Sequence, residues 1–115
     1  MGLDMYIFGL EPNEKRMHDY YGEQLAYWRK HPDLHGYIVK TFAAGSDECQ
    51  AVGLSPDDLQ SIVDAIVQKR LPYTSGPFFG VSTEEDTACS IAQLESVKEW
   101  LEKVPGRTIY YQASW

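Results

Sequence analysis

The chain has 115 residues, a length that suits one domain with a sizeable core, and we expect residues 1–115 to form a single domain. Its composition, 43% hydrophobic and 13% aromatic, is that of a folded globular protein. The formal net charge is −7, and residues 41–115 carry five Lys and Arg against eleven Asp and Glu. That balance argues against direct binding to nucleic acid, which needs a basic surface for the phosphates.

Targeting signals are not apparent in the sequence. The first residues, MGLDMYIFGL, have no basic region ahead of an apolar run, so they do not read as a secretory signal. No apolar stretch approaches the length of a membrane span, which predicts no membrane partner. Cys49 and Cys89 are too few for a disulfide framework. We therefore expect a cytoplasmic protein with reduced thiols.

The first third of the chain predicts one strand and two helices. Residues 3–8 alternate in polarity, which favours a strand. Residues 22–31, GEQLAYWRKH, favour a short helix that Pro32 ends, because a residue before proline avoids helical geometry. Pro32 suits the first position of a second helix, with Gly45 as its stop. The apolar stripe of this second helix would consist of Leu34, Ile38 and Phe42, with His35 and Val39 beside it.

The rest of the chain predicts strands near 49–54 and 107–114 with two helices between them. The helix over 55–70 carries the fullest signal, since Ser55 can cap it and its apolar residues recur at helical spacing. A second long helix lies within 82–104, where Ser82, Thr83 or Thr87 could cap it. Its inward residues would be Ile91, Leu94, Val97 and Leu101.

These elements predict an α+β fold. We expect a small, mainly antiparallel sheet of two or three strands, near 3–8, 49–54 and 107–114, packed by about four helices. One order consistent with this places the two end strands side by side.

The segment YWRKHPDLHGY, residues 27–37, is chemically crowded. His31 and His35 are four residues apart, a spacing found in zinc-binding helices. Pro32 opposes that geometry, because it places His31 at or before the helix start. A helix-capping His31 and a packed His35 are favoured instead, and no metal or other cofactor is predicted.

Two further chemistries are open for this part of the chain. Cys49 with His35 and Asp47 could form a nucleophilic site, although a lone cysteine in a small domain is more often buried and inert. Tyr27, Trp28 and Arg29 are residue types enriched among the anchors of protein interfaces. The simpler alternative is that Trp28 is buried and that the others pack within their own domain.

The glycines of LPYTSGPFFGV, residues 71–81, precede a predicted helix, where such residues can hold an anion. The segment has neither a Walker-type lysine nor a GxGxxG motif. A tight turn that packs Phe78 or Phe79 onto the core is the favoured interpretation.

Three ordered motifs resemble a family of small proteins encoded by tailed phages and by bacteria. These motifs are GLDMY (2–6), YWRK with LHGY (27–37) and LP with SGPFFG (71–80), and Asp47-Glu48-Cys49 matches an Asp-x-Cys of the family. Pro77 stands where the family tends to have Phe, and His31 falls where no histidine is expected. The resemblance implies no activity. The polar residues that match its motifs are Asp4, Arg29, Lys30, His35, Asp47 and Cys49, and they could converge as a buried network or a site.

The sequence thus predicts a small phage-associated or bacterial accessory protein, with a role in binding favoured over catalysis. The candidate binding residues are Tyr27, Arg29, Lys30, His35 and Tyr37, the candidate polar cluster adds Asp4, Asp47 and Cys49, and no catalytic residue is assigned. The expected partner is a host or phage protein, and a homodimer is also compatible. One alternative is a small enzyme or ligand binder that uses Asp4, Arg29, His35, Asp47 and Cys49. A weaker one is an acidic mimic of nucleic acid.

Overall fold

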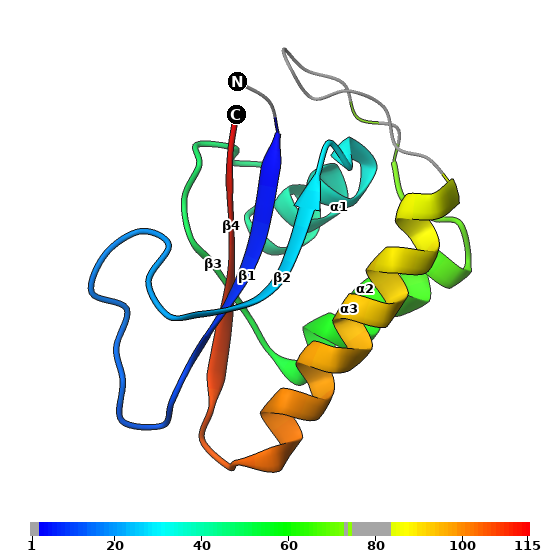
Figure 1. The fold of residues 1–115 in the computed structure, drawn as a ribbon. Helices are drawn as coiled ribbons and strands as arrows, with labels where there is room; N and C mark the ends of the chain where they lie inside the picture. The colour runs from blue at the N-terminus through cyan, green and yellow to red at the C-terminus, as the bar shows by residue number, and fades with distance from the viewer. Residues whose placement is uncertain (1–2, 73, 75–83) are drawn as a thin grey trace.

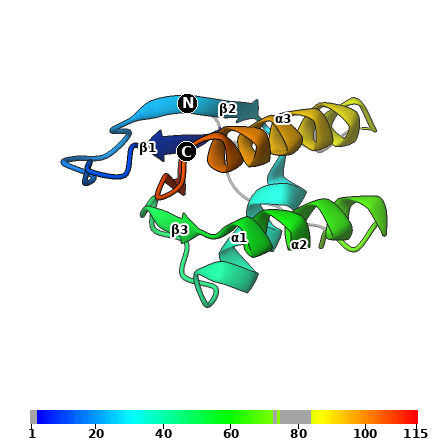
Figure 2. The same cartoon turned by 90° about the horizontal axis from the view of Figure 1, so that it is seen from below.

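The chain folds into one antiparallel sheet with helices on one of its faces (Figure 1; Figure 2). The structure, a computed structural model, describes residues 3–72, 74 and 84–115. Over these residues it contains four strands and three helices. In chain order they are β1 (Asp4–Leu10), β2 (Glu23–Arg29), α1 (Pro32–Phe42), β3 (Val52–Leu54), α2 (Pro56–Val67), α3 (Glu84–Lys103) and β4 (Thr108–Ser114).

The predicted α+β class and antiparallel pairing are confirmed, whereas the element counts differ because residues 22–31 are not a helix. Residues Glu23–Arg29 form β2, which pairs with β1 from Asp4↔Arg29 to Gly9↔Glu23. Ala26 and Trp28 are buried while Tyr27 is exposed, so the segment alternates with the period of a strand. Its Glu, Gln, Leu, Ala and Arg residues are good helix formers, and pairing with β1 overrides that local preference.

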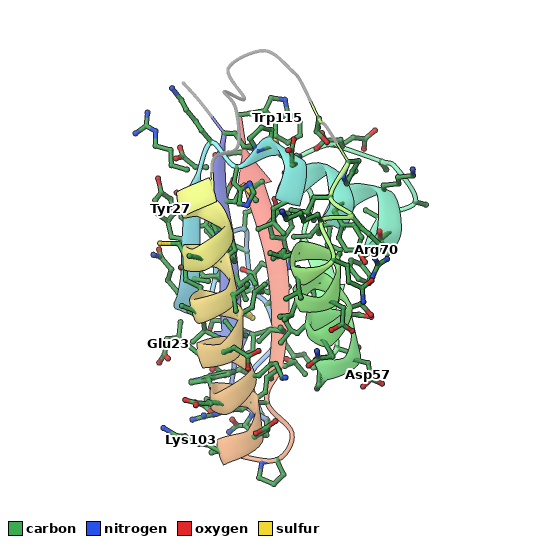
Figure 3. All side chains as sticks on the ribbon, turned by 90° about the vertical axis from the view of Figure 1, so that its right-hand side faces the viewer. Glu23, Tyr27, Asp57, Arg70, Lys103 and Trp115 are labelled. Atoms are coloured by element: carbon green, nitrogen blue, oxygen red, sulfur yellow. The ribbon has the colours of Figure 1, made fainter. Side chains whose placement is uncertain are left out.

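The sheet has the strand order β2-β1-β4-β3, so the two end strands are central neighbours, which is the one order named above as consistent with the sequence. β1 and β4 pair along their whole length, from Asp4↔Ser114 to Leu10↔Thr108. β3 is shorter than the predicted strand near 49–54, and it forms one edge of the sheet with three residues. The other edge is β2, where Tyr27 lies beside α3 (Figure 3).

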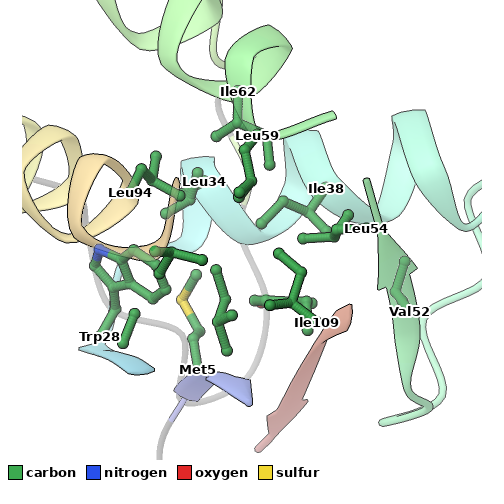
Figure 4. Close-up of a cluster of buried hydrophobic side chains, with 14 of the residues drawn as sticks. Met5, Trp28, Leu34, Ile38, Val52, Leu54, Leu59, Ile62, Leu94 and Ile109 are labelled. Atoms are coloured by element: carbon green, nitrogen blue, oxygen red, sulfur yellow. The ribbon is translucent and has the colours of Figure 1, made fainter. Parts of the chain in front are cut away.

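The main core fills the space between the sheet and the helices (Figure 4). Met5 of β1 and Ile109 of β4 point into it from the sheet, and Leu34, Ile62 and Leu94 point into it from the three helices. The predicted burial of Trp28 is confirmed, and its indole Nε1 donates to Ser90 Oγ at 2.9 Å. The apolar faces predicted for the three helices thus cover the sheet, except that Val67, predicted to belong to the apolar face of α2, is 63% exposed at its C-terminal end.

The helix boundaries follow the predicted signals closely. Ser55 caps α2 as expected, with its Oγ accepting from the Asp58 backbone N–H at 3.1 Å and its own N–H donating to the Asp58 carboxylate at 2.9 Å. Pro32 opens α1, and His31 is the N-cap residue, although its side chain makes no capping hydrogen bond to α1. Gly45 adopts a φ of +81° just beyond the end of α1.

Some predictions fall outside the described residues. They include the turn around Phe78 and Phe79, and the caps proposed at Ser82 and Thr83. Among the helices that are described, none is long and apolar enough to cross a membrane.

Candidate functional site

Strand alternation gives the sheet a second face, which points away from the helices. Met5 and Ile7 of β1 are fully buried in the main core, so Asp4 and Tyr6 point to the opposite side. Tyr27 of β2 lies directly across from Tyr6 in the register of the two strands. The polar and aromatic residues of neighbouring strands therefore share one surface, which we call the outer face.

Five aromatic rings form a continuous group on the outer face, and we call it the outer cluster: Tyr6, Phe8, Tyr20, Tyr27 and Tyr110. Tyr6 stacks on Phe8 with a centroid distance of 5.5 Å, and it lies 5.2 Å from Tyr27. Phe8 contacts Tyr110 at 5.5 Å, and Tyr20 meets Tyr6 edge-on at 5.5 Å. Phe8 and Tyr110 are each 5% exposed, whereas Tyr20 and Tyr27 are each 38% exposed. The outer cluster thus has a buried centre and an exposed rim.

Polar groups adjoin the exposed rim. The Tyr27 hydroxyl donates to Asp4 Oδ1 at 2.7 Å, and this hydrogen bond is the main reason that the pKa of Tyr27 is raised. Burial, followed by the nearby Asp4 carboxylate, raises the pKa of Tyr6. Both phenols therefore stay protonated at neutral pH. Arg29, which pairs with Asp4 in the strand register, adds an exposed cation to this surface.

The connection between β1 and β2, residues 11–22, lies against the outer face, and we call it the outer loop (Figure 1). Its Tyr21 carbonyl accepts a 2.6 Å hydrogen bond from the Tyr110 hydroxyl. The guanidinium carbon of Arg16 lies 5.6 Å from the centroid of the Tyr110 ring, and Arg16 Nη1 lies 3.0 Å from Asp19 Oδ1. The outer loop therefore covers the Tyr110 end of the outer cluster and leaves the Tyr27 end exposed.

A second polar group lies between α1 and β4, and it extends from the buried Tyr111 and His35 to the solvent-exposed Asp47. His35, which is 2% exposed, contacts Tyr111 through Nδ1 at 2.5 Å and Asp47 through Nε2 at 2.9 Å. Because a carboxylate only accepts, Nε2 carries the ring proton, and Nδ1 then accepts from the Tyr111 hydroxyl. Trp115 packs against the same imidazole, with ring centroids 5.6 Å apart.

Burial determines the protonation of this group. It lowers the pKa of His35, and the Asp47 carboxylate opposes that shift only in part. Burial, with a smaller effect of Asp47, raises the pKa of Tyr111 well above its usual value. His35 is therefore a neutral imidazole on α1 that contacts Tyr111 of β4 and Asp47 in the connection between α1 and β3. Since both ring nitrogens carry hydrogen bonds, this arrangement fits a structural link better than an accessible base.

The predicted binding residues divide between the two sides of the sheet. Tyr27 and Arg29 are exposed on the outer face, and the exposed Lys30 follows them with a φ of 56°. His35 is buried and Tyr37 is half-buried, both on α1 among the helices. The segment 27–37 is therefore not one surface, because it passes through the sheet edge into α1.

The predicted polar cluster is brought together only in part. Asp47 contacts His35, whereas Asp4 faces the opposite side of the sheet and bonds Tyr27. Cys49 is half-buried, and its backbone carbonyl accepts from the Gln112 side chain at 2.9 Å. Within the described part of the chain, no group of three His, Cys, Asp or Glu side chains could hold a metal ion.

Sequence reasoning missed the residues that complete both groups: Tyr6, Phe8, Arg16, Tyr20, Tyr110 and Tyr111. A signal for some of them was present. Alternation along 3–8 puts Tyr6 and Phe8 on one face, and alternation along 107–114 separates Tyr110 from Tyr111. Combined with neighbouring end strands, this would have placed three of the five rings of the outer cluster together.

Comparisons of the chain with protein-family models, with curated proteins and with solved structures found no match.

Proposed function

We propose that the protein is a protein-binding module that contacts its partner through the outer cluster and the adjoining Arg29. The observation that carries this proposal is the 38% exposure of Tyr20 and Tyr27 on a cluster whose centre is buried. Tyr and Arg are frequent interface anchors, because they combine a large apolar area with hydrogen-bonding groups. A surface of this kind also suits a partner better than a small-molecule cleft, since its rings are spread over three strands and a loop.

The expected partner is a protein of the phage or of the bacterial host. That expectation rests on the resemblance of the sequence motifs alone, and it stays a prediction. A second copy of the chain is an alternative partner for the same surface, and sedimentation of the purified protein distinguishes the two.

The alternative of a small enzyme has one observation in its favour, the chain of contacts from Asp47 through His35 to Tyr111. A histidine between an acid and a hydroxyl is the arrangement by which a nucleophile is activated. Here the hydroxyl belongs to a fully enclosed phenol with a raised pKa, which makes it a poor nucleophile. The binding module is therefore the better-supported function.

The test is a pull-down from bacterial lysate at physiological salt with three tagged forms of the protein. They are the wild type, a Tyr27→Ala/Arg29→Ala variant and a Val67→Ser control. The control changes an apolar side chain of α2 that is 63% exposed and lies outside the proposed surface. We expect a stoichiometric protein with the wild type and with the control, and its loss with the double variant. Circular dichroism and thermal melting of each form verify that it is folded.

Retention of the same partner by the folded double variant would contradict the proposal. Loss with Val67→Ser alone would move the binding surface to α2. A wild-type sample that captures nothing and sediments as a folded monomer would favour the His35 group as the functional site.

A further inference from the structure

One cation already lies on the outer cluster, and it belongs to the protein itself. The guanidinium of Arg16 lies over the Tyr110 ring, 5.6 Å from its centroid, and Nη1 contacts Asp19 Oδ1 at 3.0 Å. A planar cation is thus held between an aromatic face and a carboxylate. This combination suits a guanidinium better than an ammonium group, because a guanidinium both stacks on rings and donates in a fixed geometry.

The hold of Arg16 on this position is weak. Its side chain is 39% exposed and that of Asp19 is 68% exposed, and both cation–π contacts and ion pairs contribute little when solvent reaches them. The outer loop that carries Arg16 also contains Tyr20 at a φ of 57°, a left-handed conformation that bulky residues rarely adopt. Met17, between them, is 73% exposed. The contacts of Arg16 with Tyr110 and Asp19 are therefore ones that a side chain of a partner can replace.

We propose that the position over Tyr110 and beside Asp19 is a binding site for an arginine side chain of the partner, which displaces Arg16 as an internal ligand. This inference rests on the proposed binding function and specifies its partner as a basic, arginine-bearing protein segment. Charge complementarity at the site supports that choice, because Asp19 places a 68% exposed carboxylate beside the ring, and the net charge of −7 adds a general attraction for a cationic segment. Displacement of Arg16 also leaves Asp19 free to pair with the incoming guanidinium.

The test measures binding of a short fluorescein-labelled peptide of alternating Arg and Gly by fluorescence anisotropy. The same peptide with Lys in place of Arg is the comparison. We expect the Arg peptide to bind the wild type at least about threefold more tightly than the Lys peptide, because only Arg stacks and pairs at once. Equal affinities would indicate general attraction to an acidic protein and would contradict the inference.

Two pairs of variants locate the site. Arg16→Ala should tighten binding of the Arg peptide about threefold or more, since it removes the internal competitor. Lys15→Ala makes the same change of charge without vacating the site, so it should tighten binding less. Asp19→Asn should weaken binding, whereas Glu23→Gln, an exposed acid at the start of β2, should have a smaller effect. All four positions are exposed, so folding should be preserved. Equal effects within either pair would overturn the inference.

Failure of this inference is distinguishable from failure of the proposed function. If the natural partner depends on Tyr27 but the Arg peptide ignores Arg16 and Asp19, the binding module stands and its partner is not recognised through arginine. If the Arg peptide behaves as expected while the Tyr27→Ala/Arg29→Ala variant keeps the natural partner, the arginine site stands apart from the proposed surface. If the natural partner does not depend on Tyr27 and Arg29, and the Arg peptide does not depend on Arg16 and Asp19, both the proposed binding surface and the arginine site are rejected.

Discussion

The phenol of Tyr111 is enclosed in the main core, and its hydroxyl is satisfied by His35 Nδ1. Tyr111→Phe would leave that nitrogen buried without the contact, which destabilises a protein by about 1–3 kcal/mol. We expect urea unfolding to show a loss of this size. Tyr37→Phe is the control, because its hydroxyl makes only a long, exposed 3.5 Å contact to Ser61 O. A loss no larger than that of the control would show that the Tyr111–His35 contact contributes little.

The lowered pKa of His35 makes a prediction about stability and pH. The ordinary value is 6.5, and burial holds the folded-state pKa below it. Between these two values the unfolded chain binds more protons than the folded protein, so stability rises with pH. The contribution of neutral His35 is complete above pH 6.5 and is lost as the pH falls toward the folded-state pKa.

Denaturant unfolding between about pH 7.5 and about pH 5 measures this dependence. We expect the wild type to lose stability as the pH falls, and His35→Gln to show a smaller slope. Ser96→Ala, a change without a titratable group at an exposed position of α3, is the control and should keep the wild-type slope. The same slope in wild type and His35→Gln would show that another group titrates.

At the level of the elements, the edge strand β2 is completed by a side chain of α3. Gln93 Oε1 accepts from the Tyr27 N–H at 2.8 Å, and Gln93 Nε2 donates to the Tyr27 carbonyl at 3.0 Å. One amide side chain thus makes both hydrogen bonds that a neighbouring strand would make. Because unpaired edges invite association with other chains, this contact also protects the β2 edge.

Gln93→Met tests this contact with a nearly isosteric change. A thioether side chain replaces neither hydrogen bond well, so we expect a loss of about 0.5–1.5 kcal/mol and faster hydrogen exchange at the Tyr27 amide. Ser96→Ala, at an exposed position of the same helix, should change neither quantity. Unchanged exchange at Tyr27 in Gln93→Met would show that α3 covers the edge without this hydrogen bond.

The elements also show how far the sequence could predict the fold. α2 was predictable because its cap, its first-turn acids and its apolar period agree. β2 was not, since its residue types favour a helix and only its pairing with β1 makes it a strand. The end strands were found by alternation, but the register that joins Tyr6 to Tyr27 is a tertiary property.

The candidate sites were harder to predict than the elements. His35 and Tyr111 meet although they are 76 residues apart, and no local pattern contains that information. The crowded segment 27–37 suggested one site because its residues are adjacent in sequence. In the fold this segment crosses from the outer face into α1, so its residues do not form one surface although they are adjacent in sequence.

At the scale of the whole molecule, one group of exposed carboxylates lies on α3, on the side of the sheet opposite the outer loop (Figure 2). The exposed carboxylates of α3 include Glu95, Glu99 and Glu102, and the sheet lies between α3 and the outer loop (Figure 2). A mimic of nucleic acid would bind its basic partner through a face of this kind. The arginine site instead depends on one carboxylate, Asp19, next to an aromatic ring.

A Glu95→Gln/Glu99→Gln/Glu102→Gln variant separates these two ways of binding a basic partner. At about 0.15 M salt, where the Debye length is about 8 Å, distant exposed charges are largely screened. We therefore expect the triple variant, which loses three charges, to bind the Arg peptide with an affinity within about threefold of the wild type. We expect Asp19→Asn, which loses only one charge, to bind the peptide more weakly than the triple variant does. The reverse order, with a steep loss in the triple variant as salt is raised from about 0.05 M to about 0.5 M, would identify the helical face as an acidic mimic. The ranking of these two variants decides whether the partner reads one local site or the overall charge of the molecule.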